Sequence, residues 1–456
     1  MIPRTLLASA VLALCASTAL ATDLIQVWEA AQKHDPQGAI SQASRAAGSA
    51  KHDQANALWR PALALSTSAG WASAQSQMNG AQFVMPGATP IRGSGFATSV
   101  NGGAATRWAL SAKQALYNRE REAQSAQLDL AAQASEHEWQ LAQQDWMLQT
   151  TQRYFDVVLA EQRLALIEQQ QLAVNKALTE AKDRFAIGDA PVTDTHEATA
   201  RAQALSAQAI AARNERDMAR QVLTDVTGFP LAAMTLKAPK RSDVLGESDA
   251  LSVWLQKAEQ GNPMMALQQV QDKVAQQEVR KHAALAAPTL DLVAQASRDR
   301  ISGTGDFGAA SNTQNQQMVG VMLNVPLYTG GWRSAKLQEA THLQTKAQAE
   351  LERTRLQVSQ MTRAAWLAVQ SGQARIAALE AADKASQARL DATQLGRQVG
   401  DRTTLDLLNA QNDASAGQLT LLQARIDLLM GQLRLHALAG QLDAQKLQAV
   451  NAALQR

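Results

Sequence analysis

Three stretches of the sequence contain residue types that enzymes use, but none has the spacing that its chemistry requires. Gly303–Gly308 matches the glycine pattern of a dinucleotide-binding loop, yet it lies between two strand-like runs and no helix follows it. His137 and Glu138 have no second histidine at helical spacing, and the seven histidines are scattered, which argues against a metal site. No serine lies in a nucleophile elbow. We therefore expect a protein that is not an enzyme and that binds no cofactor or metal.

Charged and hydroxyl side chains are concentrated instead in two short segments that resemble each other. Ile187–Asp194 and Val399–Asp406 share a glycine, an aspartate and a final aspartate at matching positions. The interval between these two segments recurs between Gly228 and Gly440, so the correspondence extends beyond the segments themselves. Self-similarity over such a long interval predicts an internal duplication.

The first 21 residues have the pattern of a secretory signal peptide. Arg4 is followed by the apolar run Leu6–Leu14 and by the small-residue cleavage site Ala19–Ala21. The only cysteine, Cys15, lies within this segment and follows a bulky leucine, which disfavours lipidation. We expect an exported mature chain without disulfides.

Composition excludes two classes of protein. The formal net charge is only +2, so nothing favours binding to nucleic acid. After the signal peptide no stretch of about 18 apolar residues occurs, so no transmembrane helix is expected.

Two very long helices dominate the predicted secondary structure. Residues 118–187 contain neither glycine nor proline, and residues 332–399 contain no proline and only two glycines, Gly372 and Gly396. A helix of 70 residues would be about 105 Å long. Each is followed by a shorter returning helix, and apolar residues at heptad spacing predict coiled-coil packing. The two seams are Leu164, Ile167, Gln171, Val174, Leu178, Ala181 and Phe185, and Leu405, Leu408, Asn412, Ser415, Leu419, Leu422, Ile426, Leu429 and Leu433.

Four runs with a period of two predict β-strands that are apolar on one face. The alternating apolar positions are Leu63, Leu65, Ala69 and Trp71; Trp108, Leu110, Ala112 and Leu116; Leu290, Leu292, Ala294 and Ala296; and Val319, Val321, Leu323 and Val325. Loops are expected within each pair, at roughly 76–103 and 299–315.

The order of these elements predicts the domain organisation. A signal peptide (1–21) precedes a first repeat of helix, strand pair and helical hairpin (22–228). A polar linker (229–248) leads to a second repeat (249–440), and a polar tail (441–456) has no assigned role. The expected fold class is mainly α with membrane β.

The strand pattern requires more than one copy of the chain. An apolar outer face and a polar inner face are typical of strands in a membrane barrel, but the smallest such barrels have about eight strands. Open sheet edges in lipid would leave backbone groups without partners. A dimer would supply eight strands and a trimer twelve. The helices, about 100 Å long, exceed the bilayer's roughly 30 Å and must extend into an aqueous compartment.

At this point the sequence resembles the TolC-like outer-membrane efflux protein family over essentially the whole mature chain. The matching motifs are Val399–Asp406, Pro326–Gly331 before a helix, and Tyr154–Val157. The resemblance implies a homotrimer with a twelve-stranded barrel in the outer membrane and a helical tunnel in the periplasm. It also implies a periplasmic adaptor and an inner-membrane ABC or other efflux pump as partners, with protein secretion or small-molecule efflux as the task. A non-conducting periplasmic coiled-coil adaptor is the alternative.

The resemblance also implies a periplasmic gate at the hairpin tips. Arg402 matches the family's gating arginine, with Thr193 and Asp194 as expected partners, and Asp401 lies beside it. Asp406 matches the first acid of the pore constriction.

Two positions depart from the family pattern. Asn409 replaces the second constriction acid, which predicts a weaker anionic ring, and Arg397 replaces a gate tyrosine. Arg397 could pair with Asp194 through a charge-assisted hydrogen bond. Alternatively, Arg397, Asp401 and Arg402 are solvated charges worth less than about 1 kcal/mol each.

Overall fold

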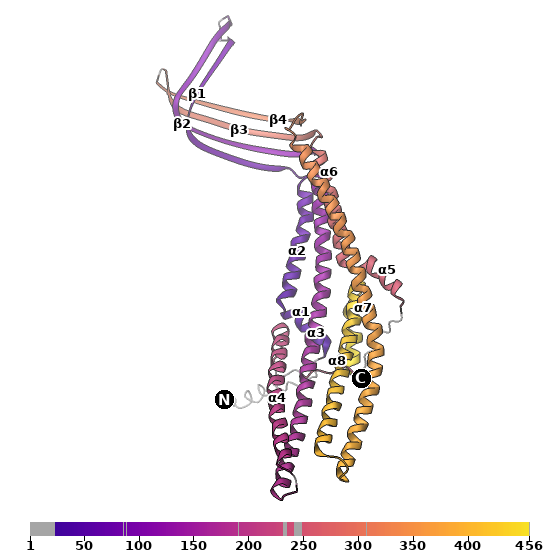
Figure 1. The fold of residues 1–456 in the computed structure, drawn as a ribbon. Helices are drawn as coiled ribbons and strands as arrows, with labels where there is room; N and C mark the ends of the chain where they lie inside the picture. Colours follow the sequence, from indigo (N-terminus) through magenta and orange to yellow (C-terminus); the bar gives the residue numbers. More distant parts are fainter. Residues whose placement is uncertain are drawn as a thin grey trace, which may run out of the picture. The chain divides into compact units, whose positions relative to one another are not determined.

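A computed structural model describes residues 23–84, 86–87, 89–189, 191–230, 235–240, 249–306 and 308–455 (Figure 1). The expected signal peptide and much of the expected linker lie outside the described residues. The elements, in order, are α1 (Leu24–His34), α2 (Pro36–Ala57), β1 (Ala62–Phe83), β2 (Ile91–Tyr117), α3 (Arg119–Ala186), α4 (Val192–Thr227), α5 (Leu251–Gly261), α6 (Pro263–Ala284), β3 (Thr289–Gly305), β4 (Gly308–Asn324), α7 (Trp332–Gln398), α8 (Thr404–Leu438) and α9 (Ala444–Gln455).

The two halves of the chain contain helices of nearly equal length in the same order. α1 and α5 have 11 residues each, and α2 and α6 have 22 each. The long helices α3 and α7 have 68 and 67 residues, and the returning helices α4 and α8 have 36 and 35. This order supports the duplication that the two similar segments predict.

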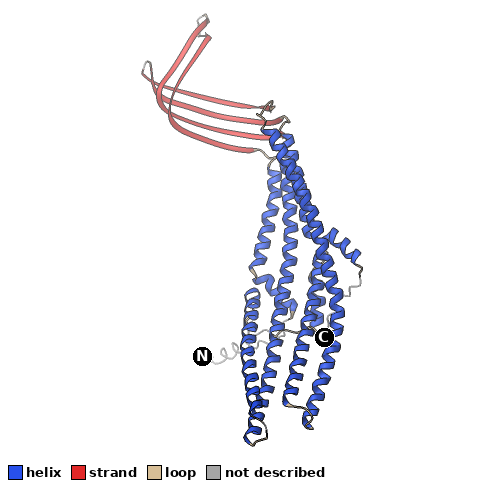
Figure 2. Ribbon diagram, in the orientation of Figure 1, coloured by secondary structure: helices blue, strands red, loops and turns tan. Residues whose placement is uncertain are grey.

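The chain forms two compact units, and the long helices pass through both. One unit, residues 48–133 and 270–348, contains all four strands, which form one antiparallel sheet in the order β1-β2-β3-β4 (Figure 2). The outer edges of β1 and β4 have no neighbouring strand within this sheet. The fold class expected from the sequence, mainly helical with four strands, is confirmed.

The expected loops at 76–103 and 299–315 are wrong, because most of both segments is strand. Small and polar residues in these stretches interrupt the apolar alternation, but backbone pairing continues through them. The ladder between β1 and β2 shifts register between Ala72 and Ala74, and that between β2 and β3 between Asn101 and Gly103. Such irregularities let a strand bend without ending.

The register confirms the alternation of the apolar faces. Leu63 pairs with Ala112, Ala112 with Ala294, and Ala294 with Val319, so one predicted apolar position from each strand lies in a single row across the sheet. Side chains opposite one another in a ladder lie on the same face. Leu63 and Val319 are 73% and 79% exposed, so this apolar face has no cover within one chain.

The other unit, residues 23–47, 134–269 and 349–455, contains the main core. Helices α1, α3, α4, α8 and α9 contribute to it, and Tyr154, Phe155, Leu429 and Leu433 are among its fully buried large side chains. Trp28 packs edge to face on Trp146 at 4.9 Å between ring centroids. Burial raises the pKa of Tyr154 to about 12. We call this cluster the basal core.

The C-terminal tail, for which the sequence indicated no role, is part of the basal core. Its last segment forms α9, and Leu447, Val450 and Leu454 are buried there. The Oδ1 of Asn451 accepts a hydrogen bond of 3.0 Å from the backbone N–H of Leu24. The sparse apolar positions of the tail are therefore one face of a short docked helix.

Side-chain ion pairs bind the helices of each hairpin to each other. Three pairs join α3 to α4, namely Glu161–Arg220, Arg163–Glu215 and Glu168–Arg213, and two join α7 to α8, namely Glu380–Arg425 and Arg389–Asp413. The predicted seam of α8 is buried at Ile426, Leu429 and Leu433. None of the described helices has an apolar stretch long enough to cross a membrane.

Candidate functional site

The two similar segments form the turns at the ends of the hairpins, α3–α4 and α7–α8. Gly188 and Gly400 have φ angles of 75° and 85°, which place both in the left-handed region that glycine adopts without strain. The N–H groups of Asp189 and Asp401 each donate a 2.8 Å hydrogen bond back to the helix, to Arg184 and Gly396. These are the contacts of a glycine-terminated helix end. The repeated Gly-Asp pair therefore fixes the same turn twice.

The helices that follow the turns begin differently. Thr403 caps α8: its Oγ1 accepts a 3.1 Å hydrogen bond from the N–H of Asp406, and its own N–H donates to the Asp406 carboxylate at 3.0 Å. This is a capping box. Helix α4 begins after Pro191, which makes no side-chain cap. The two segments are similar in sequence, but only α8 has a side-chain N-cap, and α4 does not.

The capping role determines the state of Asp406. Hydrogen bonds from the Thr403 backbone and hydroxyl, helped by the Arg402 charge, hold the pKa of Asp406 below its ordinary value. Its carboxylate is therefore ionised at neutral pH. Asp406 was expected as a constriction acid, and in one chain it also stabilises the start of its own helix.

Arg397 does not pair with Asp194, which was one possibility raised by the sequence. Its guanidinium forms an ion pair with Glu180 instead, joining α7 to α3. Both side chains are only partly exposed, at 29% and 37%. Partial burial reduces solvent screening of such a pair. The acidic partner lies along α3, before the tip turn.

A second polar link joins the other two helices. The Nη2 of Arg201 on α4 donates a 2.5 Å hydrogen bond to the Oδ1 of Asn409 on α8. Nearby, Gln170 on α3 donates to Asn412 on α8 at 3.4 Å. An acid at 409 would meet Arg201 as an ion pair, and asparagine makes the contact a hydrogen bond to a neutral acceptor.

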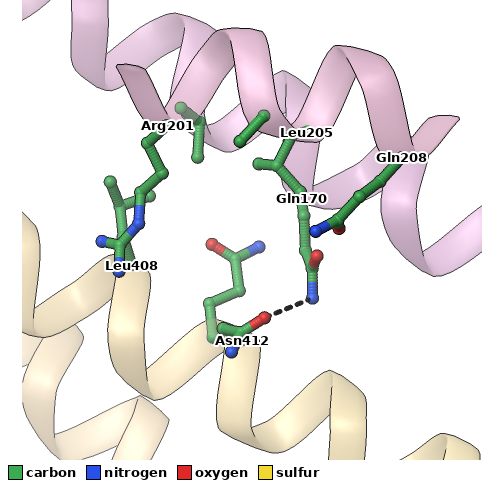
Figure 3. Close-up of a pocket in the computed structure, with 9 residues that line it drawn as sticks. Gln170, Arg201, Leu205, Gln208, Leu408 and Asn412 are labelled. Carbon is green, nitrogen blue, oxygen red and sulfur yellow. Dashed lines mark hydrogen bonds between the residues drawn. The ribbon is translucent and has the colours of Figure 1, made fainter. Parts of the chain in front are cut away.

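These contacts border a cavity of about 230 Å³ between the two hairpins (Figure 3). Figure 3 shows Arg201 extending from one helix toward Leu408, with Gln170, Gln208 and Asn412 on the other sides. Polar side chains provide much of the lining. We call the Arg397–Glu180 and Arg201–Asn409 contacts the inter-hairpin links.

The remaining expected gate residues are not brought together within one chain. The Thr193 hydroxyl donates to Asp194, its immediate neighbour, at 3.4 Å. Arg402 is exposed and lies over Gly396, where an added Cβ would approach its Cγ within 2.8 Å. In the described part of a single chain, Arg402 forms no hydrogen bond or ion pair with Thr193 or Asp194.

Sequence reasoning missed Glu180 and Arg201. Glu180 lies between the seam residues Leu178 and Ala181, and Arg201 lies beside the buried Ala202. Both are charged residues that flank a coiled-coil seam, positions that commonly carry interhelical pairs. The heptad register would have identified them as candidates but not their partners, which are more than 200 residues away.

Comparison with known proteins identifies the family. Residues 254–441 match the model of the family described as outer membrane efflux protein. The chain is 27% identical to outer membrane protein TolC of Escherichia coli (strain K12) over 450 residues, covering 96% of this chain and 86% of TolC. It is 29% identical to the alkaline protease secretion protein AprF of Pseudomonas aeruginosa over 350 residues, covering 75% of this chain and 71% of AprF.

The fold also matches solved structures. The outer membrane protein VceC of Vibrio cholerae aligns with a TM-score of 0.69 at 18% identity, covering 91% of this chain and 96% of VceC. Because the match to TolC covers 96% of this chain, the resemblance read from Val399–Asp406 is confirmed. The chain is a TolC-like outer membrane efflux protein, a channel of the outer membrane.

Proposed function

We propose that three copies of this chain form the outer-membrane channel of a tripartite export system. The channel would receive its cargo from an inner-membrane pump through a periplasmic adaptor. The observation that carries a shared barrel is the open sheet, because β1 and β4 each have one edge without a neighbouring strand. The number of three chains is what the family resemblance implies. Unpaired edges are costly in lipid, and three sheets of four strands would close into a barrel of twelve.

The faces of the sheet support the same assembly. The exposed row through Leu63 and Val319 would contact lipid. The opposite face carries the ion pairs Lys113–Asp291, at 2.9 Å, and Arg107–Asp299, at 3.3 Å. Charged pairs of this kind suit a water-filled interior. A conduit of this design needs no catalytic residues, and we propose none.

The hairpin tips would act as the periplasmic gate. Within each chain the inter-hairpin links would hold α7–α8 against α3–α4. Between chains, Arg402 would reach Thr193 and Asp194 of a neighbouring copy, the pairing that the family resemblance implies. Asp406 would provide one carboxylate per chain near the constriction, and Asn409 none. Asp401 would lie in the turn beside Arg402.

The kind of cargo follows from the comparisons only in outline. The name of AprF records secretion of an alkaline protease, and the matched family model is named for efflux. We propose export of proteins or small molecules, with the choice made by the partner pump. The organisation into two repeats (22–228 and 249–440) around a linker (229–248) remains part of this proposal.

Fractionation and conductance test the proposed function. The protein is extracted from outer membranes in mild detergent, its mass is measured with and without heating, and it is then inserted into planar bilayers. We expect a heat-sensitive complex of three chains and discrete conductance steps. A soluble monomer or dimer that produces no conductance would instead support a periplasmic coiled-coil adaptor.

A further inference from the structure

The lipid-facing side of the sheet carries two arginines where the apolar pattern ends. Along β3 this face presents Leu290, Leu292, Ala294 and Ala296, and then Arg298 and Arg300. All six positions alternate with the inward-facing ones, so the two guanidinium groups lie on the same face as the leucines. Both arginines are exposed. Two exposed cations therefore follow the apolar positions on this face of β3.

The cross-strand neighbours contain no acid that would neutralise them. Arg298 pairs in the ladder with Trp108 on β2 and Asn315 on β4, and Arg300 pairs with Thr106 and Thr313. The adjacent Asp299 points to the opposite face, where it pairs with Arg107 at 3.3 Å. Among the described ion pairs, neither arginine has a carboxylate partner. Their charge is therefore available to a ligand outside the chain.

The distance of Arg298 and Arg300 from the start of β3 indicates where they lie in the membrane. Arg298 lies eight residues beyond Leu290, a distance of about 27 Å along a strand. Strands in membrane barrels tilt by about 40°, which places Arg298 about 20 Å and Arg300 about 25 Å above Leu290. The apolar band of such barrels is about 25 Å tall and is bordered by aromatic residues.

The aromatic residues agree with this border. Trp108 lies in the same row as Arg298 and is 44% exposed. Trp71 lies in a row farther from the helices than Trp108 and is 79% exposed. At the other end of the face stand Tyr117 and Leu290, next to the helices that β2 and β3 adjoin. Because the helices belong to the periplasmic side, the arginines lie at the outer leaflet.

We propose that Arg298 and Arg300, beside Trp108, form a binding site for phosphate groups on glycolipid headgroups of the outer leaflet. Guanidinium groups form charge-assisted, often bidentate, hydrogen bonds with phosphate. The threonine and asparagine side chains in the same rows supply further hydrogen-bonding groups. This site rests on the proposed function only in requiring the sheet to lie in the outer membrane.

The test is lipid binding by the intact detergent-extracted complex, measured by native mass spectrometry. Diphosphoryl lipid A is titrated against the wild type, the Arg298→Gln/Arg300→Gln variant and an Arg92→Gln/Arg107→Gln control. The control removes the same formal charge from the same sheet, and its Arg107 lies on the opposite face from the proposed site, where it pairs with Asp299. We expect about thirtyfold weaker binding by the first variant and wild-type binding by the control. Each complex is checked for the heat-sensitive mass beforehand.

Three results would overturn the proposal. Equal affinity of the wild type and the Arg298→Gln/Arg300→Gln variant would show that the arginines do not bind the lipid. An equal loss in the control would indicate general electrostatics. An equally large loss for phosphatidylglycerol would show a site for any anionic lipid. If the double variant fails to assemble, the single variants Arg298→Gln and Arg300→Gln replace it, each with about a fivefold loss expected. Failure of wild-type membrane extraction would count against the proposed function instead.

Discussion

The basal core and the hairpin tips hold the same helices by different means. In the basal core α3, α4 and α8 meet through fully enclosed side chains such as Tyr154, Leu223 and Leu429. Toward the tips the hairpins meet through the polar inter-hairpin links, and Arg201 of one link lines a cavity. Exposing a buried apolar side chain to water costs free energy. Breaking a polar contact costs less, because water can replace either partner.

This difference indicates which part of the helical structure can move. The basal core would keep the hairpins attached while the tips separate, at the cost of two polar links per chain. Substitutions in the basal core should therefore lower the stability of the fold, and substitutions in the inter-hairpin links should mainly change channel opening.

Leu429→Ala should have the largest effect on stability. Leu429 is 0% exposed in the basal core, and truncating a leucine at such a site costs about 2–5 kcal/mol. Thermal unfolding followed by far-ultraviolet circular dichroism measures the loss. Leu172→Ala, at a position 74% exposed in one chain, is the matched control. A wild-type unfolding midpoint for Leu429→Ala would contradict the role given to the basal core.

Gly188→Ala and Gly400→Ala should destabilise both hairpin turns by similar amounts. At φ angles of 75° and 85° a Cβ costs about 1–2 kcal/mol, and no neighbouring atom blocks it in either turn. Hydrogen exchange of the amides around each turn measures the local effect. Gly417→Ala, within helix α8 and without positive φ, should be neutral or stabilising. Unequal effects at the two turns would contradict their equivalence.

Thr403→Ala should cost about 1 kcal/mol, because it removes a helix cap. Thr193→Ala, in the first turn of α4, should cost less, since Thr193 bonds only with its neighbour Asp194 among the described contacts. Local exchange rates at the starts of α8 and α4 compare the two. Equal losses of stability in the two variants would mean that the capping box does not stabilise the start of α8 more than Thr193 stabilises the start of α4.

The same cap predicts a pH dependence. The pKa of Asp406 is lowered when the helix is formed, so its contribution is fully present above the ordinary carboxyl pKa. It is lost as the pH falls through the lowered value. The start of α8 should therefore fray in acid before the basal core unfolds, and Asp406→Asn should remove that step.

Arg201→Ala combined with Arg397→Ala should have the smallest effect on stability and the largest on conductance. Partly exposed polar pairs contribute about 1 kcal/mol or less each. Among the described contacts near the cavity, the long hydrogen bond of 3.4 Å from Gln170 to Asn412 then remains between the hairpins. Planar-bilayer recordings should show larger or more frequent openings than the wild type. Arg163→Ala together with Arg389→Ala removes ion pairs within each hairpin and should leave conductance unchanged.

The sequence was sufficient for elements whose signal is local. The heptad seams predicted the long helices, and the strict alternation at Leu290–Ala296 predicted a strand. The extensions of the strands could not be read, because small and polar residues beyond the apolar band carry no period. The tail was missed for the opposite reason: Leu447, Val450 and Leu454 indicate a face only when the core they contact is known.

The tip residues show the same limit. The Gly-Asp pairs are a local pattern, and they were located correctly. The cap at Thr403 is also a local pattern, but it was not predicted. The partners of Arg397 and Asn409 depend on how one hairpin lies against the other. The heptad register marks Glu180 and Arg201 as charged residues that flank a seam, but nothing in the sequence identifies their partners.

The most direct test of the account is a reversible cross-link across one inter-hairpin link. The sequence has no cysteine after Cys15, so Glu180→Cys with Arg397→Cys introduces a defined pair into the expected mature chain. Conductance is recorded before oxidation, after oxidation and after reduction. We expect raised conductance in the reduced variant, near closure of the channel when the cross-link forms, and recovery of conductance on reduction. Conductance that is unaffected by a cross-link shown to have formed would contradict the claim that these tips close the channel.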